Sequence, residues 1–161
     1  MNTTERFMKA AQEGDADGVV AALQAGADVD ATYRERTALW WAAQEGHTAV
    51  VDVLLDAGAC VNFVDPEGFT SLKQSIGESH VEVAERLLLR GADVNHRCWS
   101  DGGCTVLHTA AAYGRLECIR LLLLYGADRE AKDDDGNTPY DTAIECREAE
   151  AAELIRSHAT A

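Results

Sequence analysis

Four residues near the middle of the chain have the types and spacing of a possible metal site. His96, Cys98, Cys104 and His108 lie within 13 residues, and two histidines with two cysteines can hold zinc tetrahedrally. Their His-x-Cys and Cys-x3-His spacings differ from the usual Cys-x2-Cys pair of zinc sites. We therefore expect no metal here, and we keep a metal-stapled regulatory module as the weaker alternative.

A second cluster could bind a cation through oxygen atoms. Asp133, Asp134 and Asp135 precede Gly136, and clustered carboxylates beside a glycine turn can hold calcium. No glutamate stands at the twelfth position of such a loop, where a calcium loop needs its bidentate ligand. We expect these aspartates to serve a turn.

The sequence carries no motif for catalysis that we recognise. It lacks Gly-x-Ser-x-Gly, a phosphate-binding loop and His-Glu-x-x-His, which would indicate a hydrolase, a nucleotide-binding protein and a metalloprotease. We therefore expect a protein that is not an enzyme and needs no cofactor.

The sequence around these residues predicts short helices that would position them. Between Thr105 and Gly126, a good N-cap threonine opens an alanine-rich segment that ends at Gly114. A leucine-rich segment follows, with Ile119 and Leu122 on one face at helical spacing. This pattern predicts two helices joined by a tight turn.

The helix pair recurs along the chain. Gly-Ala pairs begin at positions 26, 58, 91 and 126, and helix-opening threonines stand at 37, 70, 105 and 138, both at intervals of 32 to 35 residues. One helix pair has too little apolar area to be stable alone, so the copies must stack on one another.

The copies follow the pattern Asp-x-x-Gly-x-Thr-x-Leu-His, then paired alanines, a glycine, a leucine pair and Gly-Ala-Asp, and the best single copies are Thr105–Gly126 and Glu67–Asn95. This pattern resembles the ankyrin repeat. The resemblance implies an all-α solenoid of helix-turn-helix units joined by β-turn or hairpin loops. It implies a single domain over 1–161, with repeats at about 1–31, 32–64, 65–97, 98–130 and 131–161. The first and last copies depart from the pattern, as expected of caps whose outer faces meet water.

Two inner copies are irregular. In the third, Ser79 stands in the place of the turn glycine and Lys73 in the place of the motif histidine, so we expect its first helix to be the least stable inner element. The loop that leads into the fourth copy is the longest, and it contains Trp99.

Composition restricts partners and location. The net charge of −14 argues against nucleic acid and favours a protein partner with a basic surface, although acidity also serves solubility. No apolar run reaches the length of a membrane span, and the first residues do not read as a secretory signal. Five scattered cysteines, an odd number, indicate thiols in a reducing compartment. We expect a cytoplasmic protein that is a monomer when alone.

The resemblance implies protein–protein binding through a concave face, built from loop tips and exposed positions of the first helices. Five aromatic side chains fall at such positions, and aromatic residues often anchor interfaces. The alternative is that Trp41 and Phe63 pack against a neighbouring loop. A stoichiometric enzyme inhibitor or immunity-type protein is the alternative function. The expected contact residues are Tyr33, Arg34, Trp41, Gln44, Glu45, Phe63, Asp65, Glu67, Gln74, Glu78, Arg97, Trp99, Thr109 and Tyr113.

Overall fold

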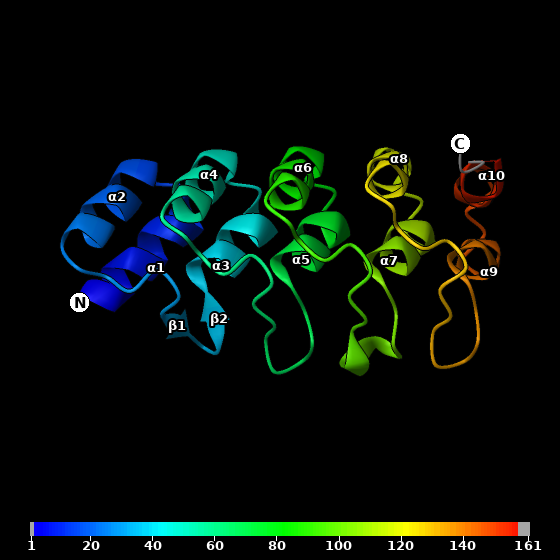
Figure 1. The fold of residues 1–161 in the computed structure, drawn as a ribbon, viewed down its shortest axis with the longest axis horizontal. Coiled ribbons are helices and arrows are strands. Elements are labelled where there is room, and N and C mark those ends of the chain that lie inside the picture. The colour runs from blue at the N-terminus through cyan, green and yellow to red at the C-terminus, as the bar shows by residue number, and fades with distance from the viewer. Residues whose placement is uncertain (1, 158–161) are drawn as a thin grey trace. The chain divides into compact units, whose positions relative to one another are not determined.

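Short helices make up most of the computed structural model, which describes residues 2–157 (Figure 1). In chain order the elements are α1 (Thr3–Glu13), α2 (Ala16–Gln24), β1 (Thr32–Tyr33), β2 (Arg36–Thr37), α3 (Ala38–Glu45), α4 (Thr48–Asp56), α5 (Ser71–Gly77), α6 (Val81–Leu89), the 3-10 turn η1 (Trp99–Asp101), α7 (Val106–Ala112), α8 (Leu116–Leu124), α9 (Pro139–Glu145) and α10 (Ala149–Ser157). Over the part of the chain described, no helix is both long enough and apolar enough to cross a membrane.

The helix boundaries follow from local sequence chemistry. The hydroxyls of Thr37 and Thr70 accept hydrogen bonds of 3.2 Å from backbone N–H groups three residues on, which caps α3 and α5. Helices α1 and α3 end at glycines with φ of 76°. Ser79 and Arg147 take the equivalent turns at φ of 65° and 66°, so the prediction that Ser79 replaces a turn glycine is confirmed.

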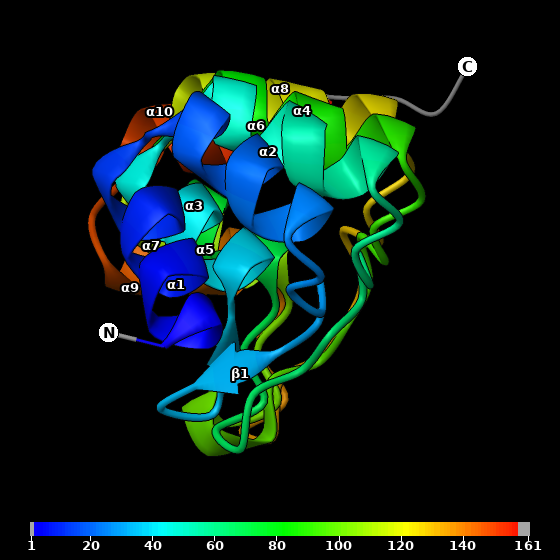
Figure 2. The same ribbon diagram turned by 90° about the vertical axis from the view of Figure 1, so that its left-hand side faces the viewer.

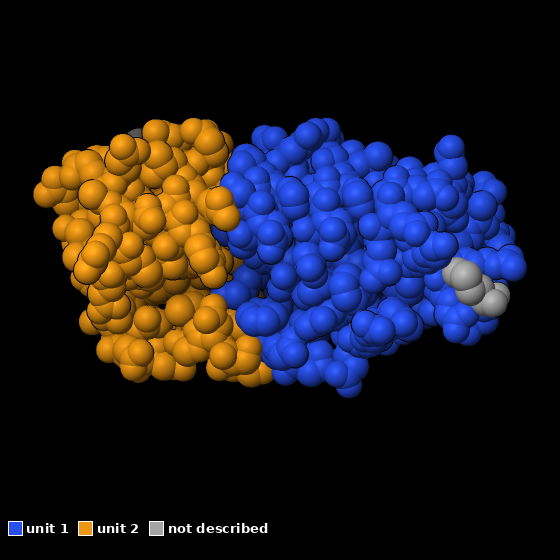
Figure 3. Space-filling model, turned by 180° about the vertical axis from the view of Figure 1, so that it is seen from behind, with its two compact units in different colours: residues 1–92 blue, residues 93–161 orange. Residues whose placement is uncertain are grey.

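The chain forms two compact units, residues 1–92 and 93–161 (Figure 3). In the first unit, α1, α3 and α5 form one layer, and α2, α4 and α6 form the other (Figure 1). In the second unit, α7 packs on α9 and α8 packs on α10. Large apolar side chains between the layers, such as Leu39 and Leu54 in the first unit and Leu107 and Leu122 in the second, are fully buried.

The expected single domain over 1–161 and its division into five repeats both stay predictions. The boundary between the two units follows Ala92, inside the third copy expected at 65–97. The expected fifth copy extends beyond residue 157, and its last four residues lie outside the described part.

Successive helix pairs in the first unit are joined by a repeated histidine contact. The Nε2 atom of His47 bonds the carbonyl oxygen of Gln12 at 2.9 Å, and Nε2 of His80 bonds that of Gln44 at 3.0 Å. Each ring lies over the turn glycine of the preceding repeat, so a Cβ at Gly46 would stand 2.6 Å from the His80 ring. The two histidines are therefore explained by the packing of one repeat on the next.

The loop into the second repeat is a short β-hairpin. Strands β1 and β2 pair antiparallel, with Thr32 opposite Thr37 and Tyr33 opposite Arg36. Arg34 and Glu35 form the turn with φ of 52° and 64°, a left-handed conformation that hairpins usually give to asparagine and glycine. In later loops that the structure describes, backbone strand pairing is reduced to isolated β-bridges, Val64 with Thr70 and Cys98 with Cys104.

Candidate partner-binding surfaces

The hairpin tip of the first unit presents Tyr33 beside α1. Tyr33 is 39% exposed, and the Arg34 guanidinium lies 5.3 Å from the centroid of its ring. Tyr33 closes a groove of about 240 Å³ whose other walls are Glu5, Met8, Lys9 and Gln12 of α1. In Figure 2, β1 lies directly below α1. Tyr33 and Arg34 are therefore accessible, as the sequence predicted.

Trp41 is less accessible than its place in the sequence implies. It is half-buried, and its ring meets the buried ring of Trp40 edge-on at 5.0 Å between centroids. The guanidinium of Arg36 covers both rings, at 4.3 Å from Trp40 and 5.7 Å from Trp41. The geometry matches the alternative in which Trp41 packs against a neighbouring loop.

Arg36 also joins the second and third repeats, a role that we did not predict from the sequence. Its Nε atom lies 3.3 Å from a carboxylate oxygen of Asp65, and its Nη2 atom lies 2.7 Å from Glu67. Asp65, expected at an accessible loop tip, is 1% exposed. Its other carboxylate oxygen accepts the backbone N–H groups of Glu67 and Phe69. Asp65 is thus a turn residue held by Arg36, and we remove it from the contact set.

The remaining predicted residues of the first unit differ in exposure. Glu45, Glu67 and Glu78 are exposed, whereas Gln44, Phe63 and Gln74 are half-buried. The glutamates on this side give the first unit several accessible carboxylates, one of which is occupied by Arg36.

In the second unit, Trp99 lies in the loop between Cys98 and Cys104. The Trp99 side chain is 58% exposed, and the residue opens the turn η1. The base of the loop is closed by a 3.0 Å hydrogen bond from the Cys98 N–H to the Cys104 carbonyl. Gly102 and Gly103, both at positive φ, allow the chain to return over this short distance.

A neighbouring loop supports the Trp99 loop. The Arg97 guanidinium donates to the Asp134 carboxylate at 3.0 Å and to the Lys132 carbonyl, and the Asp134 N–H donates to the Gly102 carbonyl at 2.8 Å. Arg97 was predicted to contact a partner, but its bonds hold the two loops together. Its first effect is therefore to position Trp99.

Two predicted residues lie on or beside α7. Tyr113, which follows α7, is 62% exposed, and the Arg115 guanidinium lies 5.8 Å from its ring. Thr109 is half-buried, and its hydroxyl is 3.4 Å from the Thr105 carbonyl. Tyr113 therefore offers contact area, whereas Thr109 offers little.

The possible zinc ligands do not form a free set. Nδ1 of His108 accepts from the Thr105 N–H at 3.2 Å, and Nε2 bonds the Asn137 carbonyl at 3.1 Å. These bonds make Nε2 the protonated nitrogen and leave neither nitrogen for a metal. Within residues 2–157 no group of three or more His, Cys, Asp or Glu side chains is placed to hold a metal ion. In the aspartate cluster, Asp133 accepts from the Asp135 and Asn137 N–H groups, as a turn residue does.

One carboxyl group has a shifted pKa. Hydrogen bonds from the Thr138 N–H at 2.9 Å and the Thr138 hydroxyl at 2.7 Å lower the pKa of Asp141 below its ordinary value of 3.8. The backbone bond is the larger cause. Asp141 lies in the first turn of α9 and forms a capping box with Thr138, so the shift reflects helix capping.

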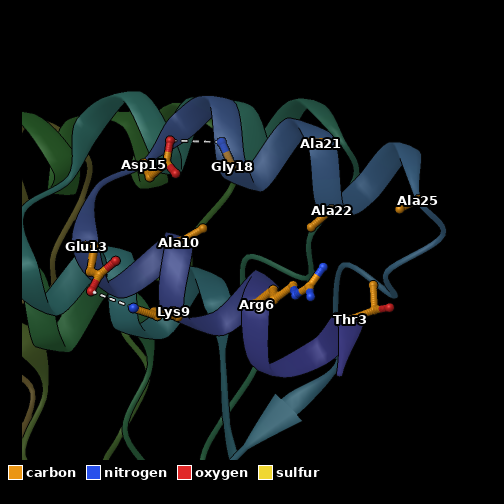
Figure 4. A pocket seen from close by; sticks show the side chains of 10 residues that line it. All are labelled: Thr3, Arg6, Lys9, Ala10, Glu13, Asp15, Gly18, Ala21, Ala22 and Ala25. Atoms are coloured by element: carbon orange, nitrogen blue, oxygen red, sulfur yellow. Dashed lines mark hydrogen bonds and ion pairs between the residues drawn. The ribbon is translucent and has the colours of Figure 1, made fainter. Parts of the chain in front are cut away.

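A groove that we did not predict lies between α1 and α2. It has a volume of about 370 Å³, with a floor that includes Ala10 and Ala22 and a rim that includes Arg6 and Asp15 (Figure 4). The signal for it was present as small residues, Gly18 and Ala22, at places where the next repeat has Val50 and Leu54.

Two family models match the chain. One described as ankyrin repeats (3 copies) matches residues 7–98, and one described as ankyrin repeats (many copies) matches residues 87–143.

Curated relatives contain similar segments. The SH3 and multiple ankyrin repeat domains protein 2 of Homo sapiens is 34% identical over 70% of this chain and 6% of its own length. The mitochondrial disaggregase of Bos taurus is 36% identical over 96% of this chain and 23% of its own length. The transient receptor potential cation channel subfamily A member 1 homolog of Caenorhabditis elegans is 35% identical over 68% of this chain and 9% of its own length. The chain spans less than a quarter of the length of these relatives.

Proposed function

Because the chain belongs to the ankyrin repeat family, we propose that it acts by binding another protein and performs no chemistry of its own. Ankyrin repeats are generally non-catalytic modules of protein–protein interaction. The relatives named above are far longer than this chain, so their activities are not transferred to it. Five cysteines without a disulfide suit a reducing compartment such as the cytoplasm.

The observation that carries the proposal is the exposure of Trp99. Trp99 is 58% exposed, so much of its apolar area lies in water, and a partner that covers this area would gain from its burial. The loop that carries it is already held by the backbone β-bridge between Cys98 and Cys104 and by the Arg97–Asp134 ion pair. Binding would therefore order few additional groups, which favours affinity.

We propose that the partner presents a basic side chain to this loop. The exposed carboxylates of Asp101 and Asp135 stand on the two loops that Arg97 and Asp134 join. A lysine or arginine could lie on the indole face in a cation–π contact while a carboxylate balances its charge. The net charge of −14 would attract such a partner over longer distances.

The first unit would supply a second contact region. We propose that Tyr33 is its anchor, with Arg34 at the hairpin tip and accessible polar groups on the first helices. Trp41 and Phe63 are half-buried and would contribute only their outer edges. The polar members of this region are Gln44, Glu45, Glu67, Gln74 and Glu78.

A matched capture experiment tests the proposal. The wild-type chain and the Trp99→Ala variant are immobilised, and proteins bound from the native cell extract are identified. A partner retained by the wild type is then purified and titrated calorimetrically. We expect Trp99→Ala to weaken binding at least about tenfold, because a well-packed interfacial tryptophan contributes about 2 kcal/mol or more.

Trp41→Ala is the matched control. It removes the same side chain from a half-buried site, so it should lower the melting temperature more than Trp99→Ala and weaken binding less. Equal affinities of the wild type and Trp99→Ala for every captured protein would overturn the assignment of Trp99 as the anchor.

The projecting Trp99 loop also favours a second function, stoichiometric inhibition of an enzyme. A fixed loop with an aromatic tip has the form needed to enter an active-site cleft. If the captured partner is an enzyme, the loss of its activity at one equivalent of the wild-type chain would support this function, and unchanged activity would exclude it for that enzyme.

A further inference from the structure

The last repeat exposes an apolar residue at a place that is buried in the other repeats. Three positions before the turn, the first helix carries Ala11, Ala43, Ile76 or Ala111, all 0% exposed. In α9 the equivalent residue is Ile144, and it is 52% exposed. A terminal repeat that only faced water would favour a polar residue here. Ile144 therefore leaves an apolar side chain uncovered at the end of the second unit.

The first repeat has a hollow on its outward side. In α2, Gly18 and Ala22 occupy the places that Val50 and Leu54 fill in α4, and both of those side chains are fully buried. The missing side-chain volume leaves the groove of about 370 Å³ between α1 and α2, whose lining side chains are drawn in Figure 4. The groove is large enough for an aliphatic side chain, and its floor includes the apolar residues Ala10 and Ala22.

Charged residues flank both surfaces. Arg6 extends along the groove (Figure 4), and within residues 2–157 it makes no ion pair, whereas the nearby Lys9 pairs with Glu13 at 3.7 Å. Next to Ile144 lies Glu145, which is exposed and likewise has no ion pair in the described part of the chain. The groove thus has an unneutralised cation, and the exposed isoleucine has a carboxylate beside it.

The contacts between repeats indicate how such surfaces would meet. The residue after each turn lies over the turn residue of the preceding repeat: His47 over Gly14 and His80 over Gly46 in the first unit, and Glu148 over Gly114 in the second. The same stacking between two copies would place Asp15 of one copy over Arg147 of the other. These side chains have opposite charges, and Arg147 is exposed.

We propose that the groove between α1 and α2 is a docking surface for the α9–α10 end of a second copy of this chain. Ile144 enters the hollow at Gly18 and Ala22, Asp15 faces Arg147, and Arg6 faces the side that carries Glu145. Because each copy has both surfaces, the contact is head-to-tail and can continue from copy to copy. The expected monomer then exists only below the dissociation constant of this junction.

Sedimentation equilibrium at rising concentrations of the 161-residue chain tests the proposal. The mass-average molecular weight of the wild type should rise with concentration, and Ile144→Glu should weaken association at least about tenfold. Arg120→Glu is the control, because Arg120 is exposed on α8 and, among residues 2–157, its ion pair is with Glu117 of the same helix at 3.7 Å. It should leave association unchanged.

A charge reversal tests the predicted alignment. Arg147→Glu places like charges opposite one another and should weaken association several-fold, and adding Asp15→Lys in the same chain should restore it. Since Asp15 caps α2 through the Gly18 N–H at 2.9 Å, circular dichroism must show that the double variant is folded. If it is not, Asp15→Asn, which can still cap the helix, should relieve part of the loss.

A wild-type chain that stays monomeric up to about 1 mM would overturn the proposal. Association that Ile144→Glu and Arg147→Glu both leave unchanged would also overturn it, because the contact between copies would then lie on another surface.

Discussion

At the scale of single residues, the turn between the two helices of the third repeat places a residue with a side chain in a backbone conformation that favours glycine. Ser79 has a φ of 65°, a conformation in which any Cβ is strained. Gly46 holds the same place in the preceding repeat at 76° without that strain. The sequence therefore retains an unfavourable residue at this turn.

We predict that Ser79→Gly raises the free energy of unfolding by about 1 kcal/mol. The matched reverse change is Gly46→Ser, which adds a Cβ that would stand 2.6 Å from the His80 ring, so it should destabilise by more than that amount. Urea unfolding measures both. If Ser79→Gly lowers the midpoint, the turn does not hold Ser79 in the left-handed conformation.

The Arg36 side chain is the second residue whose replacement we expect to matter. Its removal would leave the buried carboxylate of Asp65 without its guanidinium partner and uncover the Trp40 ring. We predict a loss of about 2 kcal/mol for Arg36→Ala, measured by urea unfolding.

Arg34→Ala is the control for this change, because Arg34 is exposed at the hairpin tip and its guanidinium lies over the ring of the neighbouring Tyr33. It should change the free energy of unfolding by less than about 0.5 kcal/mol. Equal effects of the two substitutions would argue that Arg36 does not stabilise the contact between the second and third repeats.

At the scale of elements, helix capping links one titration to stability. Hydrogen bonds from the Thr138 N–H and hydroxyl lower the pKa of Asp141 in the folded chain. A lowered pKa means that the folded state favours the charged carboxylate. Its stabilising effect on α9 is therefore present above the ordinary pKa of 3.8 and is lost as the pH falls through the folded value.

We predict that Asp141→Asn lowers the melting temperature at pH 7, and that its difference from the wild type shrinks as the pH is lowered from about 5 to about 2. Glu85→Gln is the control, since Glu85 is exposed on α6 and its side chain makes no hydrogen bond within the described part. A difference that stays constant with pH would show that the ionised Asp141 does not stabilise α9.

The sequence predicts elements well where the cause is local. Threonine caps and turn glycines act within a few residues, so the start of α3 at Thr37 and its end at Gly46 were predictable. The burial of Trp41 and Asp65 was not, because both depend on Arg36, which reaches them from the hairpin. The groove at Gly18 and Ala22 was missed for another reason: it arises from side-chain volume that is absent.

Helix α5 of the third repeat buries polar residues at places where the equivalent helix of the second repeat buries mainly apolar ones. Helix α5 buries Ser71, Lys73 and Ser75, and the Ser71 hydroxyl has no hydrogen-bond partner among the described residues. At the equivalent places α3 buries Ala38, Trp40 and Ala42. A buried polar group without a hydrogen bond costs about 1–3 kcal/mol. Among the described residues, the indole N–H groups of Trp40 and Trp41 in α3 have no hydrogen-bond partner either, so the greater instability of α5 stays a prediction from its irregular sequence.

At the scale of the whole molecule, the excess of acidic residues is a property that no single site explains. The chain has 28 Asp and Glu residues against 14 Lys and Arg. Like charges repel one another within the folded chain and destabilise it, while the same field attracts a basic partner. Salt screens both effects, because the Debye length falls from about 30 Å at 0.01 M to about 3 Å at 1 M.

The two effects of screening can be separated by experiment. We predict that raising salt from about 0.02 M to about 0.5 M increases the melting temperature of the isolated chain but slows association with its partner about tenfold or more. Dissociation should change little with salt, because it depends on the short-range contacts at Trp99. Trp99→Ala should dissociate from the partner faster than the wild type does. Its association rate should depend on salt in the same way as that of the wild type. Stopped-flow association rates for both chains supply the measurement. If the association rate does not depend on salt, the acidity of this chain serves its solubility, and its partner is recognised by the aromatic side chains alone.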